Sequence, residues 1–169
     1  MEGSRRGHAA WRMAVLAGMM LVSVPALDAL AAKLRITNSY TPLNAERPVR
    51  RSTEYIVLHT TEGSDTPSLR RVQRLGLAHY VVLTNGTVHR VVHKHREARH
   101  AGRSMWEGHD GLDAWSIGIE VVGYHNRPLT GLQEAALREL LRQLQSLYDI
   151  PDRNVITHSQ VAYGAPNRW

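Results

Sequence analysis

The sequence predicts a single α/β domain with a mixed central β-sheet flanked by helices, and three observations carry this prediction. Short β-rich runs alternate along the chain with two helical patterns, which is typical of α/β folds. An Asn-Gly pair joins two of the β-rich runs, so part of the sheet is expected to be antiparallel. The 169 residues are 43% hydrophobic and 21% charged, which suits one domain with its own core.

The N-terminal region has the pattern of an export signal. Arginines precede an apolar run over 13–27, and Ala29-Leu30-Ala31 follows. This order predicts a secretory signal peptide over residues 1–31, with an uncleaved N-terminal anchor as the alternative. We expect export to the periplasm or to the extracellular cell wall, and no membrane span after cleavage. Residues 32–52 have no clear period and are predicted to form an N-terminal arm, followed by the domain at 53–169.

The first predicted strand of the domain ends at a histidine. Tyr55-Ile56-Val57-Leu58 is a short apolar run with β-branched residues, and it brings His59 to its C-terminal end. Catalytic groups and ligands collect at the C-terminal ends of strands in open α/β sheets. A lone histidine there is more often a packed or edge residue than a metal ligand, so this strand by itself leaves both readings open.

A helix and a hairpin come next in the chain. A Thr-Pro pair and an apolar residue at every third position predict a short helix over 66–76. Asn85-Gly86 lies between the β-rich segments 79–84 and 87–92 and predicts a hairpin with a type I′ turn. Residues 94–111 are polar and rich in Gly, His and Arg, and they are predicted to form a long loop.

The second half of the domain places a carboxylate and another histidine on strands. Residues 115–123 alternate as a buried strand, with Glu120 on the face that also carries Gly118. A carboxylate in such a strand is costly unless it is paired or used, and the alternative is an edge residue that faces water or an arginine. Thr130 begins a capping box and a leucine-rich core helix. The last strand, over 154–157, leads into His158.

These three strands suggest a hydrolytic metal site if they are neighbours in the sheet. His59, His158 and Glu120 would then meet at one edge. Neutral imidazoles can hold zinc with an open position for water, whose pKa the ion lowers. The carboxylate can take the proton of that water and pass it to a leaving amine.

The chain resembles the zinc-dependent N-acetylmuramoyl-L-alanine amidases, a family that includes the AmpD-like enzymes and is similar to peptidoglycan recognition proteins. Five segments carry the resemblance, in the family's order between Glu54 and Val161. They are Tyr55-Ile56-Val57-Leu58-His59-Thr60-Thr61, Ala78-His79-Tyr80-Val81-Val82 with Asn85-Gly86-Thr87-Val88, Arg99-His100-Ala101-Gly102, Ser116-Ile117-Gly118-Ile119-Glu120, and Thr157-His158-Ser159-Gln160.

The resemblance implies a role for each matched residue. His59 and His158 match the two histidine ligands of the zinc ion, and Glu120 matches the catalytic glutamate of the AmpD-like branch. His100 matches a position that lines the substrate cleft, and His79 is read as cleft wall or sheet packing. The implied fold is the mixed sheet of the amidases, and the implied reaction is hydrolysis of the amide between N-acetylmuramic acid and L-alanine. Peptidoglycan or muropeptides are therefore the expected partners.

One element of the family pattern is absent from the sequence. Family members carry an Asp or Cys as a third zinc ligand shortly after the second histidine, often in a Lys-x-Asp-Pro-Gly segment, but residues 161–169 contain no Asp, Cys or Lys. Catalytic zinc sites have three protein ligands as a rule. Two readings follow. The sequence is a fragment of a longer amidase, which we favour, or it is a peptidoglycan-binding module without catalytic activity.

Composition narrows the partners further. A net charge of +6 and a pI near 10.2 favour anionic partners, although a solvated basic surface is the simpler explanation of the charge, which we prefer. No basic run alternates with aromatic residues, so we expect no nucleic acid partner. The absence of cysteine excludes disulfides and thiolate metal sites. We expect a monomer, and we interpret His93 and His95 as a solvated strand end rather than a second metal site.

Overall fold

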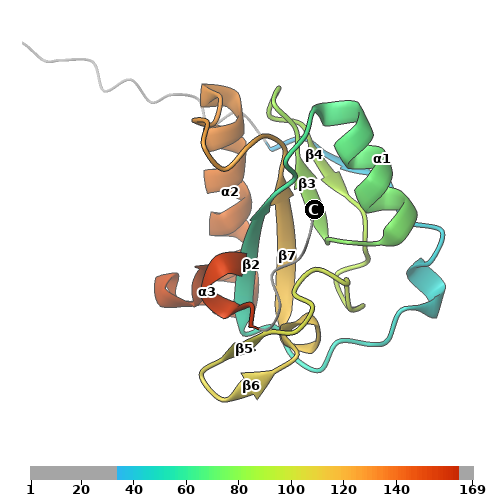
Figure 1. Ribbon diagram of the computed structural model, residues 1–169, viewed down its shortest axis with the longest axis vertical. Helices are drawn as coiled ribbons and strands as arrows, with labels where there is room; N and C mark the ends of the chain where they lie inside the picture. Colours follow the sequence, from blue (N-terminus) through green and yellow to red (C-terminus); the bar gives the residue numbers. More distant parts are fainter. Residues whose placement is uncertain (1–33, 164–169) are drawn as a thin grey trace, which may run out of the picture. The chain divides into compact units, whose positions relative to one another are not determined.

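The computed structural model describes residues 34–163, which contain a six-stranded sheet, three α-helices and a small separate hairpin (Figure 1). In spatial order the strands of the main sheet are β1 (Ile36–Asn38), β4 (Val88–Arg90), β3 (Tyr80–Val82), β7 (Ser116–Val121), β2 (Tyr55–Thr60) and β8 (Val155–Thr157). The helices are α1 (Asp65–Leu75), α2 (Gly131–Tyr148) and α3 (His158–Val161), with 3-10 turns at Asn44–Glu46, Leu112–Ala114 and Asp152–Asn154.

The sheet is mixed, as predicted. Strands β3 and β4 pair antiparallel, whereas every other neighbouring pair of the sheet is parallel. Strands β7, β2 and β8 are consecutive in the sheet, so the three strands that carry or precede Glu120, His59 and His158 are direct neighbours. This adjacency is the condition on which the predicted site depended.

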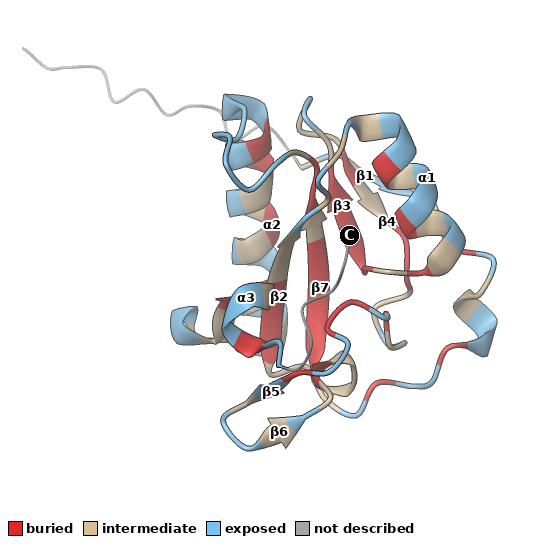
Figure 2. Cartoon of the chain, viewed as in Figure 1, coloured by how far each residue is buried: buried red, intermediate tan, exposed pale blue. Residues whose placement is uncertain are grey.

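The two long helices lie on opposite sides of the strands in Figure 1. Helix α2 packs Leu140 and Leu144 against one face of the sheet, where Ile117 and Ile119 of β7 meet them. Val81 of β3 is the register partner of Glu120 and so lies on the other face, where it forms a second cluster with α1 and the chain around 91–98. Figure 2 shows β2, β7 and β3 as largely buried, so the sheet is covered on both faces.

The predicted C-terminus of α1 and N-terminus of α2 are present, but the N-cap of α1 is Ser64, two residues earlier than the predicted N-cap at Thr66, so Thr66 and Pro67 lie in the first turn. Helix α1 ends at Gly76, whose φ of 60° suits glycine at a C-cap. At the start of α2, Thr130 Oγ1 accepts a hydrogen bond from the Gln133 backbone N–H at 3.1 Å, and Gln133 Oε1 accepts one from the Thr130 N–H at 3.2 Å. This reciprocal pair is the predicted capping box.

The hairpin is correctly predicted, but its turn type is wrong. Strands β3 and β4 pair Val82 with Val88. Gly86 donates its N–H to the carbonyl of Leu83 and has a φ of 79°, whereas Asn85 is not among the residues with positive φ. The connection is therefore a turn followed by a left-handed glycine rather than a type I′ turn, which requires two residues with positive φ.

Two predicted irregular segments contain strands. The arm over 32–52 contributes β1, which pairs parallel with β4 at the edge of the sheet. The predicted loop over 94–111 contains the hairpin of β5 (Met105–Trp106) and β6 (His109–Asp110). Its turn residues, Glu107 and Gly108, have φ values of 44° and 85°. The strands in these two segments are too short and too exposed to show an alternating pattern in the sequence.

No helix within residues 34–163 is long and apolar enough to cross a membrane. The predicted signal peptide at 1–31 lies outside the described residues.

Candidate active site

The site is built where β7, β2 and β8 run side by side. His59 in β2 is the register partner of Glu120 in β7, so the two side chains leave the sheet on the same face. On the other side of β2, Leu58 pairs with Thr157 at the end of β8, and His158 follows as the first residue of α3. The site faces away from α2, because Ile117 and Ile119, of opposite parity, contact that helix.

The imidazoles of His59 and His158 approach each other through like nitrogen atoms. Their Nδ1 atoms are 3.0 Å apart, and the ring centroids are separated by 4.8 Å. Burial, followed by the effect of His158, lowers the pKa of His59 from 6.5 to about 3. His59 is therefore neutral at physiological pH, which is the state in which histidine binds metals.

Glu120 is a buried carboxylate with an unsatisfied oxygen. Its Oε2 atom is buried and has no hydrogen-bond partner among the described residues. Burial raises the pKa of Glu120 from 4.5 to about 7, against the opposing effect of Arg71 on α1. A carboxyl group with a pKa near neutrality can both take and release a proton, as acid–base catalysis requires.

His100 lies behind His59 and does not reach the surface. Its side chain has no exposed area, and its Nδ1 is 3.1 Å from His59 Nε2. On the other edge of the ring, Nε2 is 3.1 Å from Ser116 Oγ. The predicted direct contact between His100 and substrate stays a prediction, which this burial disfavours. The contact between His100 and His59 was not predicted, because it joins a loop to a strand 41 residues away.

His79 is a packing residue of the sheet interior, one of the two roles predicted for it. The side chain is fully buried, and its Nδ1 accepts the Gly118 backbone N–H at 3.0 Å. The proton on Nε2 then goes to the Arg96 carbonyl at 2.8 Å. Arg50 lies against the same ring, and burial lowers the pKa of His79 to about 3, so its imidazole is neutral.

The residues present fit zinc in donor type and spacing but do not complete its coordination. Two nitrogen donors at about 2.0–2.1 Å from a tetrahedral zinc ion are separated by roughly 3.4 Å, close to the 3.0 Å between the Nδ1 atoms. Within 34–163, however, no group of three His, Cys, Asp or Glu side chains is arranged to hold a metal. The structure thus supplies two ligands of the predicted site, and the third is not among the residues described.

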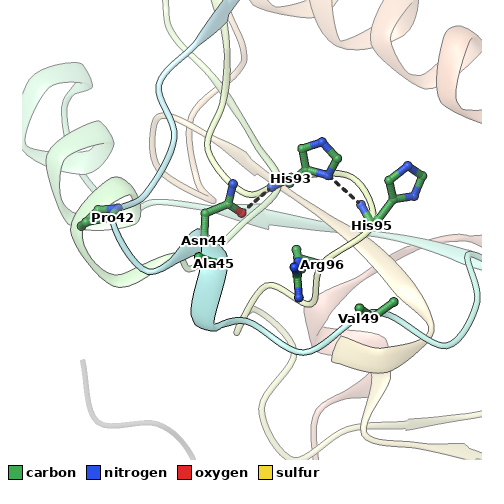
Figure 3. A pocket seen from close by; sticks show the side chains of 7 residues that line it. All are labelled: Pro42, Asn44, Ala45, Val49, His93, His95 and Arg96. Atoms are coloured by element: carbon green, nitrogen blue, oxygen red, sulfur yellow. Dashed lines mark hydrogen bonds between the residues drawn. The ribbon is translucent and has the colours of Figure 1, made fainter.

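A separate cavity of about 580 Å³ lies between the N-terminal arm and the chain after β4. Figure 3 shows the rings of His93 and His95 side by side at its rim, with Asn44 Oδ1 accepting the backbone N–H of His93. None of the strand-end residues lines this cavity. Burial, followed by His95 and nearby cations, lowers the pKa of His93. The interpretation of this pair as a solvated strand end remains the simpler one.

Comparisons with known proteins identify the family of this chain. The family model described as N-acetylmuramoyl-L-alanine amidase matches residues 49–168. The chain is 29% identical over 86 residues to a 1,6-anhydro-N-acetylmuramyl-L-alanine amidase, AmpD, from Haemophilus influenzae, covering 50% of this chain and 47% of the relative. It is 31% identical over 97 residues to AmpD from Enterobacter cloacae, covering 57% of this chain and 52% of that relative. The matched region thus spans about half the length of these relatives.

The fold is similar to that of amidases whose structures have been solved. AmpDh3 from Pseudomonas aeruginosa, in complex with anhydromuramic pentapeptide, superimposes with a TM-score of 0.62 and 26% identity, covering 69% of this chain and 55% of that one. AmiD from E. coli, in complex with anhydro-N-acetylmuramic acid-L-Ala-D-γ-Glu-L-Lys, superimposes with a TM-score of 0.60 and 27% identity, covering 66% of this chain and 50% of that one.

Proposed function

Because the chain belongs to the N-acetylmuramoyl-L-alanine amidase family, we propose that it is a zinc-dependent hydrolase of peptidoglycan. The bond cleaved would be the amide between the lactyl group of N-acetylmuramic acid and L-alanine. The observation that supports this proposal most directly is the convergence of His59 and His158 beside the unpartnered carboxylate of Glu120. The muropeptide complexes of the two structural neighbours agree with this substrate class.

His59 and His158 would hold the ion through nitrogen lone pairs. Zinc bound there would supply Lewis-acid activation of a water molecule and of the amide carbonyl. Burial keeps His59 neutral, so no proton has to leave that ring before the metal binds.

Glu120 would perform the proton transfers. Above its pKa of about 7 the carboxylate can accept a proton from the attacking water, and it can then donate this proton to the amine of L-alanine as the amide bond breaks. Its unsatisfied Oε2 atom is available for this step because no protein group competes for it among the described residues.

A second function is favoured by one observation. The described residues contain no third side chain arranged to complete a metal site. A chain with two histidine ligands would bind zinc weakly and would act as a peptidoglycan-binding module without hydrolysis.

Zinc content and product release distinguish these functions. The full chain is incubated with zinc, unbound zinc is removed by dialysis, and the zinc that remains bound is measured by elemental analysis. It is then incubated with an anhydromuropeptide and with intact sacculi, and released peptides are identified by mass spectrometry. The enzyme reading predicts near-stoichiometric zinc and a free stem peptide. Sedimentation with sacculi but no zinc and no released peptide would establish the binding module instead.

The Glu120→Gln variant tests the assigned role. It should keep its zinc content and lose measurable turnover, because the amide cannot act as a base. If zinc is lost with activity, Glu120 is a ligand rather than the proton carrier.

We also propose that the protein acts after export, in the periplasm or at the cell wall, as a monomer. The charge and apolar pattern of residues 1–31 supports export. Fractionation of cells that express the full chain, with N-terminal sequencing of the product, tests cleavage near residue 31.

A further inference from the structure

Three side chains form a continuous hydrogen-bonded line from the protein interior to the proposed metal site. Ser116 Oγ at the start of β7 is 3.1 Å from His100 Nε2, and His100 Nδ1 is 3.1 Å from His59 Nε2. His59 Nδ1 then faces His158 Nδ1 at 3.0 Å. The direction of the hydrogen bonds along this line can be worked out from its buried end.

The buried end is fixed by an atom that can only accept. The Leu112 carbonyl oxygen lies 2.6 Å from Ser116 Oγ and takes the single hydroxyl proton. Ser116 Oγ must therefore accept in its contact with His100, and the proton of that contact belongs to His100 Nε2. The Asp113 carboxylate, whose Oδ1 lies 3.8 Å from the same nitrogen, is too distant for a hydrogen bond, but its negative charge favours a proton on that nitrogen.

The assignment then passes from one ring to the next. A neutral imidazole carries a single proton. With that proton on Nε2, His100 Nδ1 has a lone pair and accepts from His59 Nε2. His59 then has its own proton on Nε2, which leaves a lone pair on Nδ1 directed at the His158 side.

The His100 ring is held rigidly enough to serve this purpose. Asp113 Oδ1 accepts the backbone N–H groups of His100 and Ala101 at 3.0 and 2.8 Å, which fixes the loop that carries the ring. The ring lies directly against Gly118 of β7, where an added Cβ would be 2.3 Å from His100 Cγ. Ser116 and Gly118 are thus small residues on the face of β7 that also carries Glu120.

We propose that Ser116 and His100 are positioning residues that hold His59 in the tautomer protonated on Nε2 and so present its Nδ1 lone pair to a metal ion. The metal part of this inference rests on the proposed function, whereas the tautomer of His59 does not. Groups hydrogen-bonded to the free nitrogen of a ligating histidine set its tautomer and orientation in the same way in other metal proteins.

Two substitutions of similar size separate positioning from packing. In His100→Asn the amide oxygen can occupy the place of Nδ1 and accept from His59, whereas His100→Leu removes the acceptor. Ser116→Ala is a smaller third variant that removes only the acceptor for His100 Nε2. Near-ultraviolet circular dichroism of each full-length variant verifies that the domain is folded.

The first readout is the tautomer of His59 in the metal-free protein, measured by long-range 15N–1H correlation of the imidazole nitrogens. The wild type and His100→Asn should show His59 protonated on Nε2. His100→Leu and Ser116→Ala should show a mixture of tautomers or protonation on Nδ1. If the tautomer of His59 is unchanged in both of these variants, or is already Nδ1-protonated in the wild type, the proposal is wrong.

The second readout is zinc affinity, measured by competition with a chromophoric chelator. Loss of such a supporting hydrogen bond costs ~10–100-fold in metal affinity, so His100→Leu should weaken zinc binding by that factor and His100→Asn should restore most of it. Equal affinity in all three proteins would overturn the positioning role. If the wild type binds no zinc but shows the predicted tautomers, the proposed function is wrong, while the hydrogen-bonded line from Ser116 to His59 still holds.

Discussion

Replacing Glu120 with glutamine should stabilise the metal-free protein and do so increasingly as the pH rises. The pKa of Glu120 is 4.5 in the unfolded reference and about 7 in the folded protein, because burial disfavours the carboxylate. Between these values the folded state binds more protons than the unfolded state. The free energy of unfolding therefore falls as the pH rises through this window, and it levels off above about 7.

The magnitude follows from the two pKa values. A carboxyl group whose pKa rises from 4.5 to about 7 on folding costs the protein about 3 kcal/mol at about pH 8 and about 1 kcal/mol at about pH 5. Glutamine has no proton to lose, so Glu120→Gln removes this cost. The difference in unfolding free energy between the variant and the wild type should widen by about 2 kcal/mol between these pH values.

Urea unfolding of both proteins at the two pH values, in the presence of a chelator, provides the measurement. Buried neutral histidines such as His59 and His79 also make stability depend on pH, but they do so equally in both proteins. Glu46→Gln, at an exposed position of the Asn44–Glu46 turn, is the matched control and should change stability by no more than ~0.5 kcal/mol at either pH. A difference between Glu120→Gln and the wild type that stays constant with pH would refute the reasoning.

Three further substitutions test the packing around the site. Gly118→Ala should lower the free energy of unfolding by about 1–3 kcal/mol, because the added Cβ would lie 2.3 Å from His100 Cγ. Gly131→Ala is the control and should be close to neutral, because its Cβ meets no atom within 4 Å. Equal unfolding midpoints of the two variants would contradict this prediction. His79→Leu leaves a backbone N–H and a carbonyl unpaired and should cost about 2–4 kcal/mol near neutral pH. The pKa of His79 is about 3 in the folded protein and 6.5 ordinarily, so the unfolded state binds the extra proton as the pH falls below 6.5 and the wild type loses stability. The His79→Leu variant should lose less stability over the same pH range. Unfolding midpoints measured at decreasing pH test this. Thr130→Ala removes the N-cap acceptor of α2 and should cost about 1 kcal/mol, with faster amide exchange in the first turn; unchanged exchange would argue against the cap.

The sequence predicted the strand-borne part of the site because each strand carries its own signal. An apolar run that ends in a histidine places His59 at the end of β2, and strict alternation places Glu120 on one face of β7. The register between these strands then brings the two residues opposite each other. Their roles as ligand and proton carrier stay predictions until the metal and the reaction are measured.

The parts that could not be predicted depend on contacts between distant segments. The edge strand β1 is three residues long and is held by backbone pairing to β4, so it leaves no hydrophobic pattern. The contact of His100 with His59 depends on how the 94–111 loop folds back over β7. One signal for it was present, because Ser116 and Gly118 are small residues at alternating positions before Glu120, and small residues on a buried face leave room for another group.

One physical cause sets the protonation of both kinds of group in the site. Removal from water disfavours charge, so it lowers the pKa of His59 to about 3 and raises that of Glu120 to about 7. Near neutral pH the histidine is therefore an uncharged nitrogen donor, while the carboxyl group is close to the midpoint of its titration. The state of Glu120 opposes folding, since the unfolded chain would ionise this carboxyl group freely near neutral pH, whereas an unfolded histidine is itself mostly neutral there. The clusters of buried apolar residues on both faces of the sheet must offset this cost, and a cation held between the imidazoles would offset part of it by stabilising the Glu120 carboxylate.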